Sequence, residues 1–151
     1  MSHIPVNHHL RPLYRVLAGL AAVYVIIFGV AGVVRTSDLS FFARAETSVL
    51  GLRTNLAFSV ASIAVGVLIL LALFVGRNVD KAVNLWFGVV FMAVGVGTLA
   101  VLHTDLNKLN FSLATVIVSF VIGMVLFCAG LYGKTGTAEQ AREVQLAQLG
   151  K

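Results

Sequence analysis

The apolar stretch NLAFSVASIAVGVLILLALFV at residues 55–75 decides the fold of this chain. It contains no charged residue and no proline, and Arg53 and Arg77 stand just outside its two ends. At about 1.5 Å per residue, a helix of this length is about 30 Å long, which matches the hydrocarbon core of a bilayer. We therefore predict a transmembrane helix here, with its charged neighbours at the two membrane surfaces.

The composition extends this interpretation to the whole chain. Of its 151 residues, 59% are hydrophobic and 11% are charged, whereas ordinary soluble domains carry roughly 25% charged residues. The net charge of +5 is scattered over the polar segments. Such a pattern in a membrane protein indicates orientation and contact with lipid headgroups, and we expect no nucleic-acid partner.

Three further apolar runs have the same character. They predict an all-α membrane protein, a four-transmembrane-helix bundle with short loops, whose helices occupy about residues 13–35, 53–76, 82–103 and 109–133 of a domain over residues 1–134. Residues 135–151 are polar and predict a cytoplasmic tail with some helical propensity. The first loop holds Phe41 and Phe42 among charged side chains, which predicts a short segment at the membrane interface.

The basic residues predict the orientation of the bundle. Four spans place both termini and the turn at residues 76–81 on one side of the membrane. That side carries seven Lys and Arg residues, namely Arg11, Arg15, Arg77, Lys81, Lys134, Arg142 and Lys151. The opposite side carries four, namely Arg35, Arg44, Arg53 and Lys108. By the positive-inside rule, we expect a multi-pass protein with both termini in the cytoplasm.

The beginnings of the second and fourth runs are similar. Phe58-Ser59-Val60-Ala61 and Phe111-Ser112-Leu113-Ala114 each follow an asparagine, at positions 55 and 110. An even number of spans restores orientation, so a repeat of this kind joins two parallel helical hairpins. Apolar sequence of low complexity also produces such similarity by chance, and both interpretations stay open.

The sequence shows no group of residues typical of a catalytic, cofactor or metal site. None of the four runs holds an acidic or basic residue near its centre, which a proton-coupled transporter needs. His103 stands at the end of the third run, where it is expected to be a wet interfacial side chain, and Cys128 is the single cysteine. The chain has no nucleophile–base pair, phosphate loop or metal-ligand motif. We expect no enzyme activity, catalytic residue, cofactor or metal site.

Small and polar residues are the remaining candidates for contact sites. For helix packing or partner contact we predict Gly29, Gly32, Asn84, Gly95 and Ser119. For binding the headgroups of anionic phospholipids we predict Arg11, Arg15, Arg77 and Lys81. Serines inside the runs usually bond to backbone, but Ser59, Ser62 and Ser119 would line the water-filled path of a channel.

Several motifs resemble a known family. They are Asn7-His8-His9-Leu10-Arg11-Pro12-Leu13-Tyr14-Arg15, Leu50-Gly51-Leu52-Arg53-Thr54-Asn55, Gly76-Arg77-Asn78-Val79-Asp80 with Asn84, and Ala129-Gly130-Leu131-Tyr132-Gly133-Lys134. They are similar to actinobacterial four-helix membrane proteins of unknown function, and most of all to members found with the mycobacterial respiratory supercomplex, in which cytochrome bcc and cytochrome aa3 oxidase are joined.

The resemblance implies a non-catalytic accessory subunit in the bacterial inner membrane, with no cofactor of its own. Such a subunit would pack against cytochrome bcc and cytochrome aa3 oxidase subunits and stabilise their association with one another and with lipids. The alternative is a small oligomeric membrane transporter or channel.

Overall fold

The computed structural model describes residues 6–149, which form five helices and one small hairpin of strands. The helices are α1 (Arg11–Thr36), α2 (Leu56–Val75), α3 (Val79–Val101), α4 (Leu113–Leu131) and α5 (Ala138–Gln148), and the strands are β1 (Ser48–Val49) and β2 (Leu52–Arg53). The helices α1 to α4 are long and apolar enough to cross a membrane. The predicted four-helix membrane bundle is therefore confirmed.

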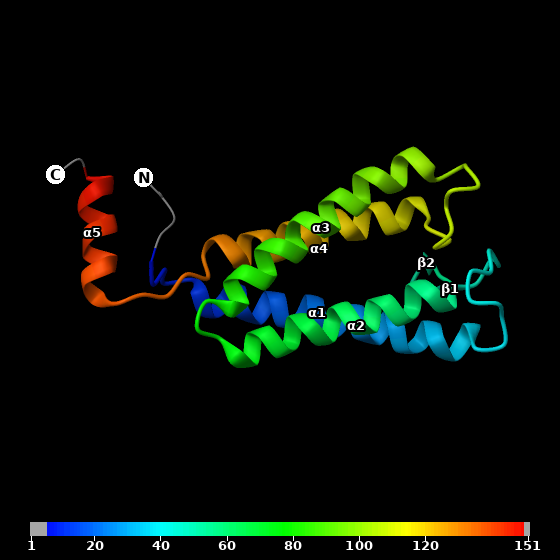
Figure 1. Ribbon diagram of the computed structural model, residues 1–151, viewed down its shortest axis with the longest axis horizontal. Helices are drawn as coiled ribbons and strands as arrows, with labels where there is room; N and C mark the ends of the chain where they lie inside the picture. Colours follow the sequence, from blue (N-terminus) through cyan, green and yellow to red (C-terminus); the bar gives the residue numbers. More distant parts are fainter. Residues whose placement is uncertain (1–5, 150–151) are drawn as a thin grey trace.

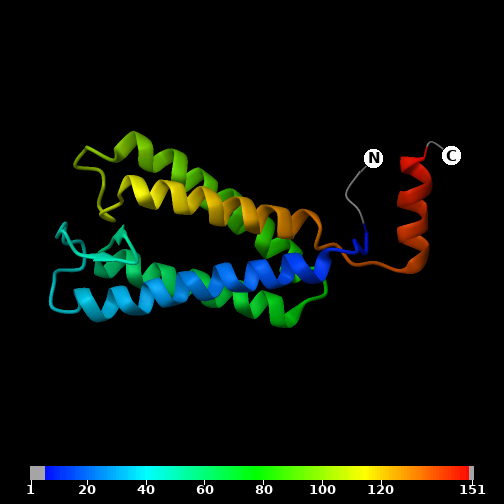
Figure 2. The same ribbon diagram turned by 180° about the vertical axis from the view of Figure 1, so that it is seen from behind.

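The bundle is built from two antiparallel helix pairs. The helix α1 packs mainly on α2, and α3 packs mainly on α4, whereas the contacts between the two pairs are sparser. Figures 1 and 2 show the two pairs close together at one end and diverging toward the other, where the strands β1 and β2 lie.

The two ends of the bundle collect different parts of the chain (Figures 1 and 2). The segment before α1, the α2–α3 turn and the α4–α5 connection meet at one end, which we call the termini end. The α1–α2 loop and the α3–α4 loop meet at the other, the loop end. Residues 1–5 and 150–151 lie outside the described residues, and the cytoplasmic location of the termini stays a prediction.

Glycines bring the helices of each pair into close contact. A Cβ added at Gly29 of α1 would lie 2.6 Å from the carbonyl oxygen of Ser59 in α2. In the second pair, a Cβ added at Gly130 of α4 would lie 2.6 Å from the backbone nitrogen of Leu85 in α3. Real Cβ atoms do not approach other atoms so closely, so each helix pair depends on having no side chain at these points.

The first loop differs from its prediction because it contains the β1–β2 hairpin. Ser48 pairs with Arg53 and Val49 with Leu52, and the turn between them is Leu50-Gly51 with φ of 51° and 80°. Two positive φ values are typical of a type I′ turn, which usually begins with Asn, Asp or Gly. Because a leucine occupies the first position of the turn, the sequence does not predict this hairpin.

The helix starts also differ from the predicted bounds. The second helix begins at Leu56 because Asn55 caps it, its side chain accepting a hydrogen bond from the Phe58 N–H. The fourth begins at Leu113, after a capping box formed by Ser112 and Thr115. The third begins three residues earlier than predicted, so Asp80 belongs to a helix rather than to a turn. The predicted tail contains α5, which lies crosswise beyond the termini end (Figure 1).

Candidate functional site

A single buried carboxylate gathers two arginines at the termini end. Asp80, in the first turn of α3, is 1% exposed. Its Oδ2 accepts a hydrogen bond of 3.2 Å from Nη2 of Arg11 and another from Nη1 of Arg15. An acidic side chain in the first turn also interacts favourably with the helix dipole. The carboxylate therefore stabilises α3 locally and attaches it to α1.

The same arginines bind the ends of the remaining membrane helices. Nε of Arg11 donates to the carbonyl of Gly133, 3.0 Å away and just after α4. Nη2 of Arg15 donates to the carbonyl of Leu73, in the last turn of α2. Cations favour helix C-termini, where carbonyl groups lack intrahelical partners. This cluster therefore joins all four membrane helices at one end.

The structure places two of the four residues predicted to bind lipid headgroups in an ion pair within the chain. Arg11 and Arg15 were predicted to face lipid headgroups, but the structure gives them Asp80 as a partner and leaves their side chains 24% and 31% exposed. Arg77 is exposed and Lys81 is half-buried, both at the α2–α3 turn. The lipid contact of these four residues stays a prediction.

Sequence reasoning missed Asp80, although a signal for it exists. Asp80, Asn84 and Gly88 are spaced four residues apart, so they share one face of α3, and all three are buried. The Oδ1 atoms of Asp80 and Asn84 are both buried without a hydrogen-bond partner among the described residues. An acidic residue that is followed at four-residue steps by an amide and a glycine on the same buried face indicates a carboxylate that points into the bundle.

Asparagines tie the two helix pairs together at the loop end. Asn55, before α2, donates through Nδ2 to the carbonyl of Lys108 at 2.8 Å. Asn110, before α4, donates through Nδ2 to the carbonyls of Ala45 at 2.7 Å and Thr54 at 3.1 Å. Each asparagine therefore belongs to one helix pair and binds the loop of the other. This reciprocal arrangement follows the similarity between the second and fourth runs.

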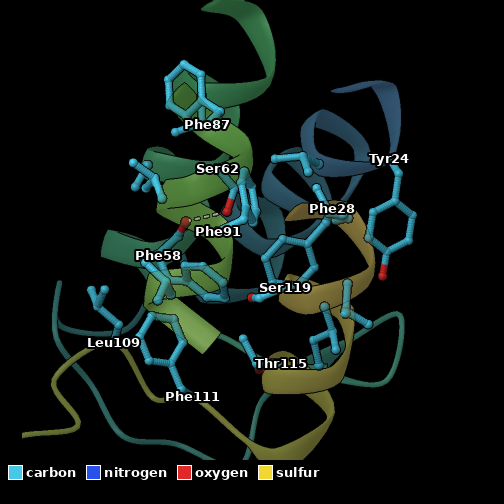
Figure 3. A pocket seen from close by; sticks show the side chains of 18 residues that line it. Tyr24, Phe28, Phe58, Ser62, Phe87, Phe91, Leu109, Phe111, Thr115 and Ser119 are labelled. Carbon is cyan, nitrogen blue, oxygen red and sulfur yellow. Dashed lines mark hydrogen bonds between the residues drawn. The ribbon is translucent and has the colours of Figure 1, made fainter. Parts of the chain in front are cut away.

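An apolar cavity of about 190 Å³ lies between the helix pairs, toward the loop end (Figure 3). Its wall is almost entirely carbon and includes side chains of all four membrane helices. The largest wall side chains are aromatic, namely Tyr24, Phe28, Phe58, Phe87, Phe91 and Phe111. Ser62 and Ser119 also line it, and the Ser62 hydroxyl donates to the Phe58 carbonyl at 2.8 Å.

The channel alternative required Ser59, Ser62 and Ser119 on one polar path. Ser59 lies outside the cavity wall, is fully buried, and bonds to Thr54 Oγ1 and to the Asn55 carbonyl, both at 2.8 Å. The cavity that Ser62 and Ser119 line offers little to an ion, because its surface is hydrocarbon. These serines do not form a continuous polar path.

The five residues predicted for helix packing or partner contact all face the inside of the bundle. Gly29 and Gly32 lie against Ser59 of α2, and Gly95 lies against Phe120 of α4. Asn84 and Ser119 are 2% and 6% exposed. The structure therefore employs them within the chain, and a contact with another protein needs a different surface.

The chain matches the model of one known protein family. The family model for DUF4383, a domain of unknown function, matches residues 15–132. The chain belongs to the DUF4383 family. The match covers α2, α3, α4 and all but the first four residues of α1, and it includes Arg15 and Asp80, whereas Arg11 and α5 lie outside it. Comparisons with curated proteins and with solved structures gave no match. The resemblance to a family of unknown function is confirmed.

Proposed function

We propose that this DUF4383 chain is a non-catalytic accessory subunit of an actinobacterial respiratory supercomplex. In this role it packs within the membrane against subunits of cytochrome bcc and cytochrome aa3 oxidase and stabilises their association. The choice of partner rests on the resemblance of the sequence motifs to proteins found with the mycobacterial respiratory supercomplex. The observation that supports a contact role is the outward face of α3.

The helix α3 has an unoccupied face with the spacing of a helix-packing seam. It buries the smallest share of its span within the chain, 22% against 33% to 44% for the other three. The exposed residues of α3 include Val79, Val94, Gly97 and Leu99. The other six recur at alternating steps of four and three, namely Ala82, Trp86, Val89, Ala93, Val96 and Ala100. We call this set the α3 seam. A period of 3.5 residues is typical of a helix that packs along another helix.

Gly97, beside the α3 seam, is unlike the other glycines of the membrane helices. A Cβ added at any other glycine described in α1 to α4 would meet an atom within 4 Å, whereas at Gly97 it would meet none. Ala93 and Gly97 are exposed and four residues apart. In membranes, small residues at this spacing let a second helix approach closely, and dispersion contacts then drive association.

Lipids are the second expected partner. The termini end carries Arg11, Arg15, Arg77, Lys81 and Lys134 against Asp80. The helix α5 on the same side adds Arg142, Glu139 and Glu143, which makes six cations against three carboxylates. This side therefore attracts anionic phospholipid at about 1 kcal/mol per basic residue near the surface. We propose that such lipids surround the subunit in the inner membrane, with both termini in the cytoplasm.

Gentle native extraction tests this function. The endogenous chain carries a tag, is solubilised in mild detergent, and its companions are identified by mass spectrometry. We expect subunits of cytochrome bcc and aa3 oxidase to elute with the wild-type chain and to be reduced with Gly97→Leu, which fills the space beside the α3 seam. Ala64→Leu, on the exposed face of α2, is the matched control. Elution without respiratory subunits, or as a self-oligomer that transports ions after reconstitution, would favour the transporter or channel.

A further inference from the structure

The apolar cavity adjoins a second hollow at the loop end, whose lining includes charged and polar side chains. Phe111 lines both spaces. On the β2 side the lining changes from apolar to charged within one residue, because Leu52 lines the cavity and Arg53 lines the hollow. On the α4 side Thr115 lines the cavity and Ser112, Leu113 and Ala114 line the hollow. The cavity suits a hydrocarbon tail, and the hollow, which carries Arg53, suits a polar headgroup. We call them the tail region and the head region.

The tail region lies at lipid depth and opens to the side of the bundle. Ala61 of α2 and Val94 of α3 both line the cavity and are both exposed, which indicates an opening between these helices. Along α4 the wall runs from Thr115 to Ile122, about 10 Å at about 1.5 Å per residue. Its volume of about 190 Å³ exceeds the roughly 150 Å³ of a dry Leu/Ile/Phe-lined cavity that holds benzene. The space therefore suits several carbons of a hydrocarbon chain.

The head region is complementary to a phosphate. Arg53 and Glu46 both line it, and Glu46, 3.3 Å away with a side chain that is 90% exposed, is the described ionic partner of Arg53. An exposed pair of this kind contributes about 0–1 kcal/mol, so an incoming phosphate can replace the carboxylate. The first residues of α4 also line the hollow, and that first turn has no acidic residue. Ser112 caps the N–H of Thr115, and the remaining N–H groups of the turn present the positive end of the helix dipole, up to about half a positive charge.

We infer that this site binds one anionic membrane phospholipid from the leaflet at the loop end. One acyl chain occupies the cavity between the helix pairs, and the phosphate lies in the hollow beside Arg53 and the start of α4. The lipid fills the space where the two pairs diverge and acts as a component of the fold. This inference does not depend on the accessory-subunit function, since it concerns the chain by itself.

Native mass spectrometry of the delipidated full chain tests the inference. The protein is incubated with phosphatidylglycerol and phosphatidylcholine of identical acyl chains, and retained lipid is counted. We expect one phosphatidylglycerol per chain, retained in preference to phosphatidylcholine. Arg53→Gln should lower this preference about fivefold, the equivalent of about 1 kcal/mol for one basic contact, whereas Lys108→Gln, exposed and outside the hollow, should preserve it. Equal retention of the two lipids by the wild-type chain would overturn the assignment of an anionic phospholipid to this site.

A matched pair of substitutions on α2 tests the tail region. Ala61→Phe fills the cavity and should reduce retained lipid at least about tenfold, while Ala64→Phe adds the same ring to an exposed position outside the wall and should leave retention unchanged. Equal retention by both variants would overturn the assignment of the cavity.

A measurement on the wild-type chain removes any dependence on the folding of the variants. Phosphatidylglycerol with a photoreactive group in one acyl chain is bound at one lipid per chain, irradiated, and the labelled peptides are mapped. Labels at Phe91 and Val118, on the cavity wall, support the inference. Labels confined to outward-facing residues such as Leu68 and Phe74 would contradict it.

Discussion

Arg15 and Asp80 stand 65 residues apart and form an ion pair between α1 and α3. These helices belong to different pairs and are not packed against each other along their length. The pair therefore reaches across the centre of the bundle at its termini end. At the loop end, where the helix pairs diverge, the buried link between them is made by the uncharged side chains of Asn55 and Asn110. The exposed ion pair of Arg44 and Asp105 joins the same two loops.

Asp80→Asn should destabilise the bundle. The substitution keeps the shape of the side chain but leaves Arg11 and Arg15 without their counter-charge. Removing one partner of a fully buried pair costs about 3–5 kcal/mol, and because both arginines are partly exposed we expect about 1–3 kcal/mol here. Unfolding in mixed micelles with increasing SDS, followed by circular dichroism, measures the change. Asp105→Asn removes a fully exposed partner of Arg44 and should have no measurable effect; equal effects of the two substitutions would contradict the central role of Asp80.

Gly29→Ala and Gly97→Ala should differ in their effect on the stability of the bundle, although the chemical change is identical. At Gly29 the new methyl group would meet Ser59 and Ile63 at 2.6 Å, so α1 and α2 must separate. We expect a loss of about 1–3 kcal/mol, as for other overpacked interiors. At Gly97 no atom lies within 4 Å, and Ala is the better helix former by about 0.5–1 kcal/mol. The same SDS titration should find Gly97→Ala at least as stable as the wild type, and a loss there equal to that of Gly29→Ala would disprove this packing.

Two substitutions at Asn110 should separate backbone strain from hydrogen bonding. Asn110 has φ of 58° and donates to the carbonyls of Ala45 and Thr54. Asn110→Gly tolerates the positive φ but loses the hydrogen bonds, with an expected cost of about 1–2 kcal/mol. Asn110→Ala loses the hydrogen bonds and also strains the backbone at this positive φ, so it should cost about 1 kcal/mol more. Hydrogen exchange of the loop-end amides measures local opening, and unchanged protection in both variants would exclude the proposed link between the helix pairs.

Labelling of engineered cysteines should establish the orientation. In a Cys128→Ala background, Ser40→Cys places a thiol at the loop end and Glu143→Cys places one on α5. With the termini in the cytoplasm, a membrane-impermeant maleimide added to intact cells should label the first and spare the second until the cells are lysed. The reverse pattern would show that the positive-inside rule fails for this chain.

The four membrane helices were predictable because bilayer thickness fixes their length and excludes charges from their middle. The local turns were harder to predict from the sequence. The β1–β2 hairpin, for example, depends on a positive φ at Leu50, which a leucine rarely adopts. Asp80 was placed in a turn because its neighbours in sequence are polar. Its burial depends on Arg11 and Arg15, which approach it only once the helices have assembled.

The contact and cavity surfaces were predictable only in part. Glycine content indicated close helix packing, but which glycines face inward depends on the rotation of each helix, and Gly95 and Gly97 of α3 therefore have opposite roles. The cavity between the helix pairs arises from their divergence, a feature of tertiary packing that no local pattern in the sequence records.

Purification of tagged cytochrome aa3 oxidase in mild detergent tests the accessory-subunit proposal most directly. Quantitative mass spectrometry then measures how much of this chain accompanies the enzyme. The proposal predicts a fixed, near-stoichiometric amount of the wild-type chain and of Ala64→Leu, and a marked decrease for Gly97→Leu at equal expression. Oxidase that is purified with cytochrome bcc but without this chain would contradict the proposal.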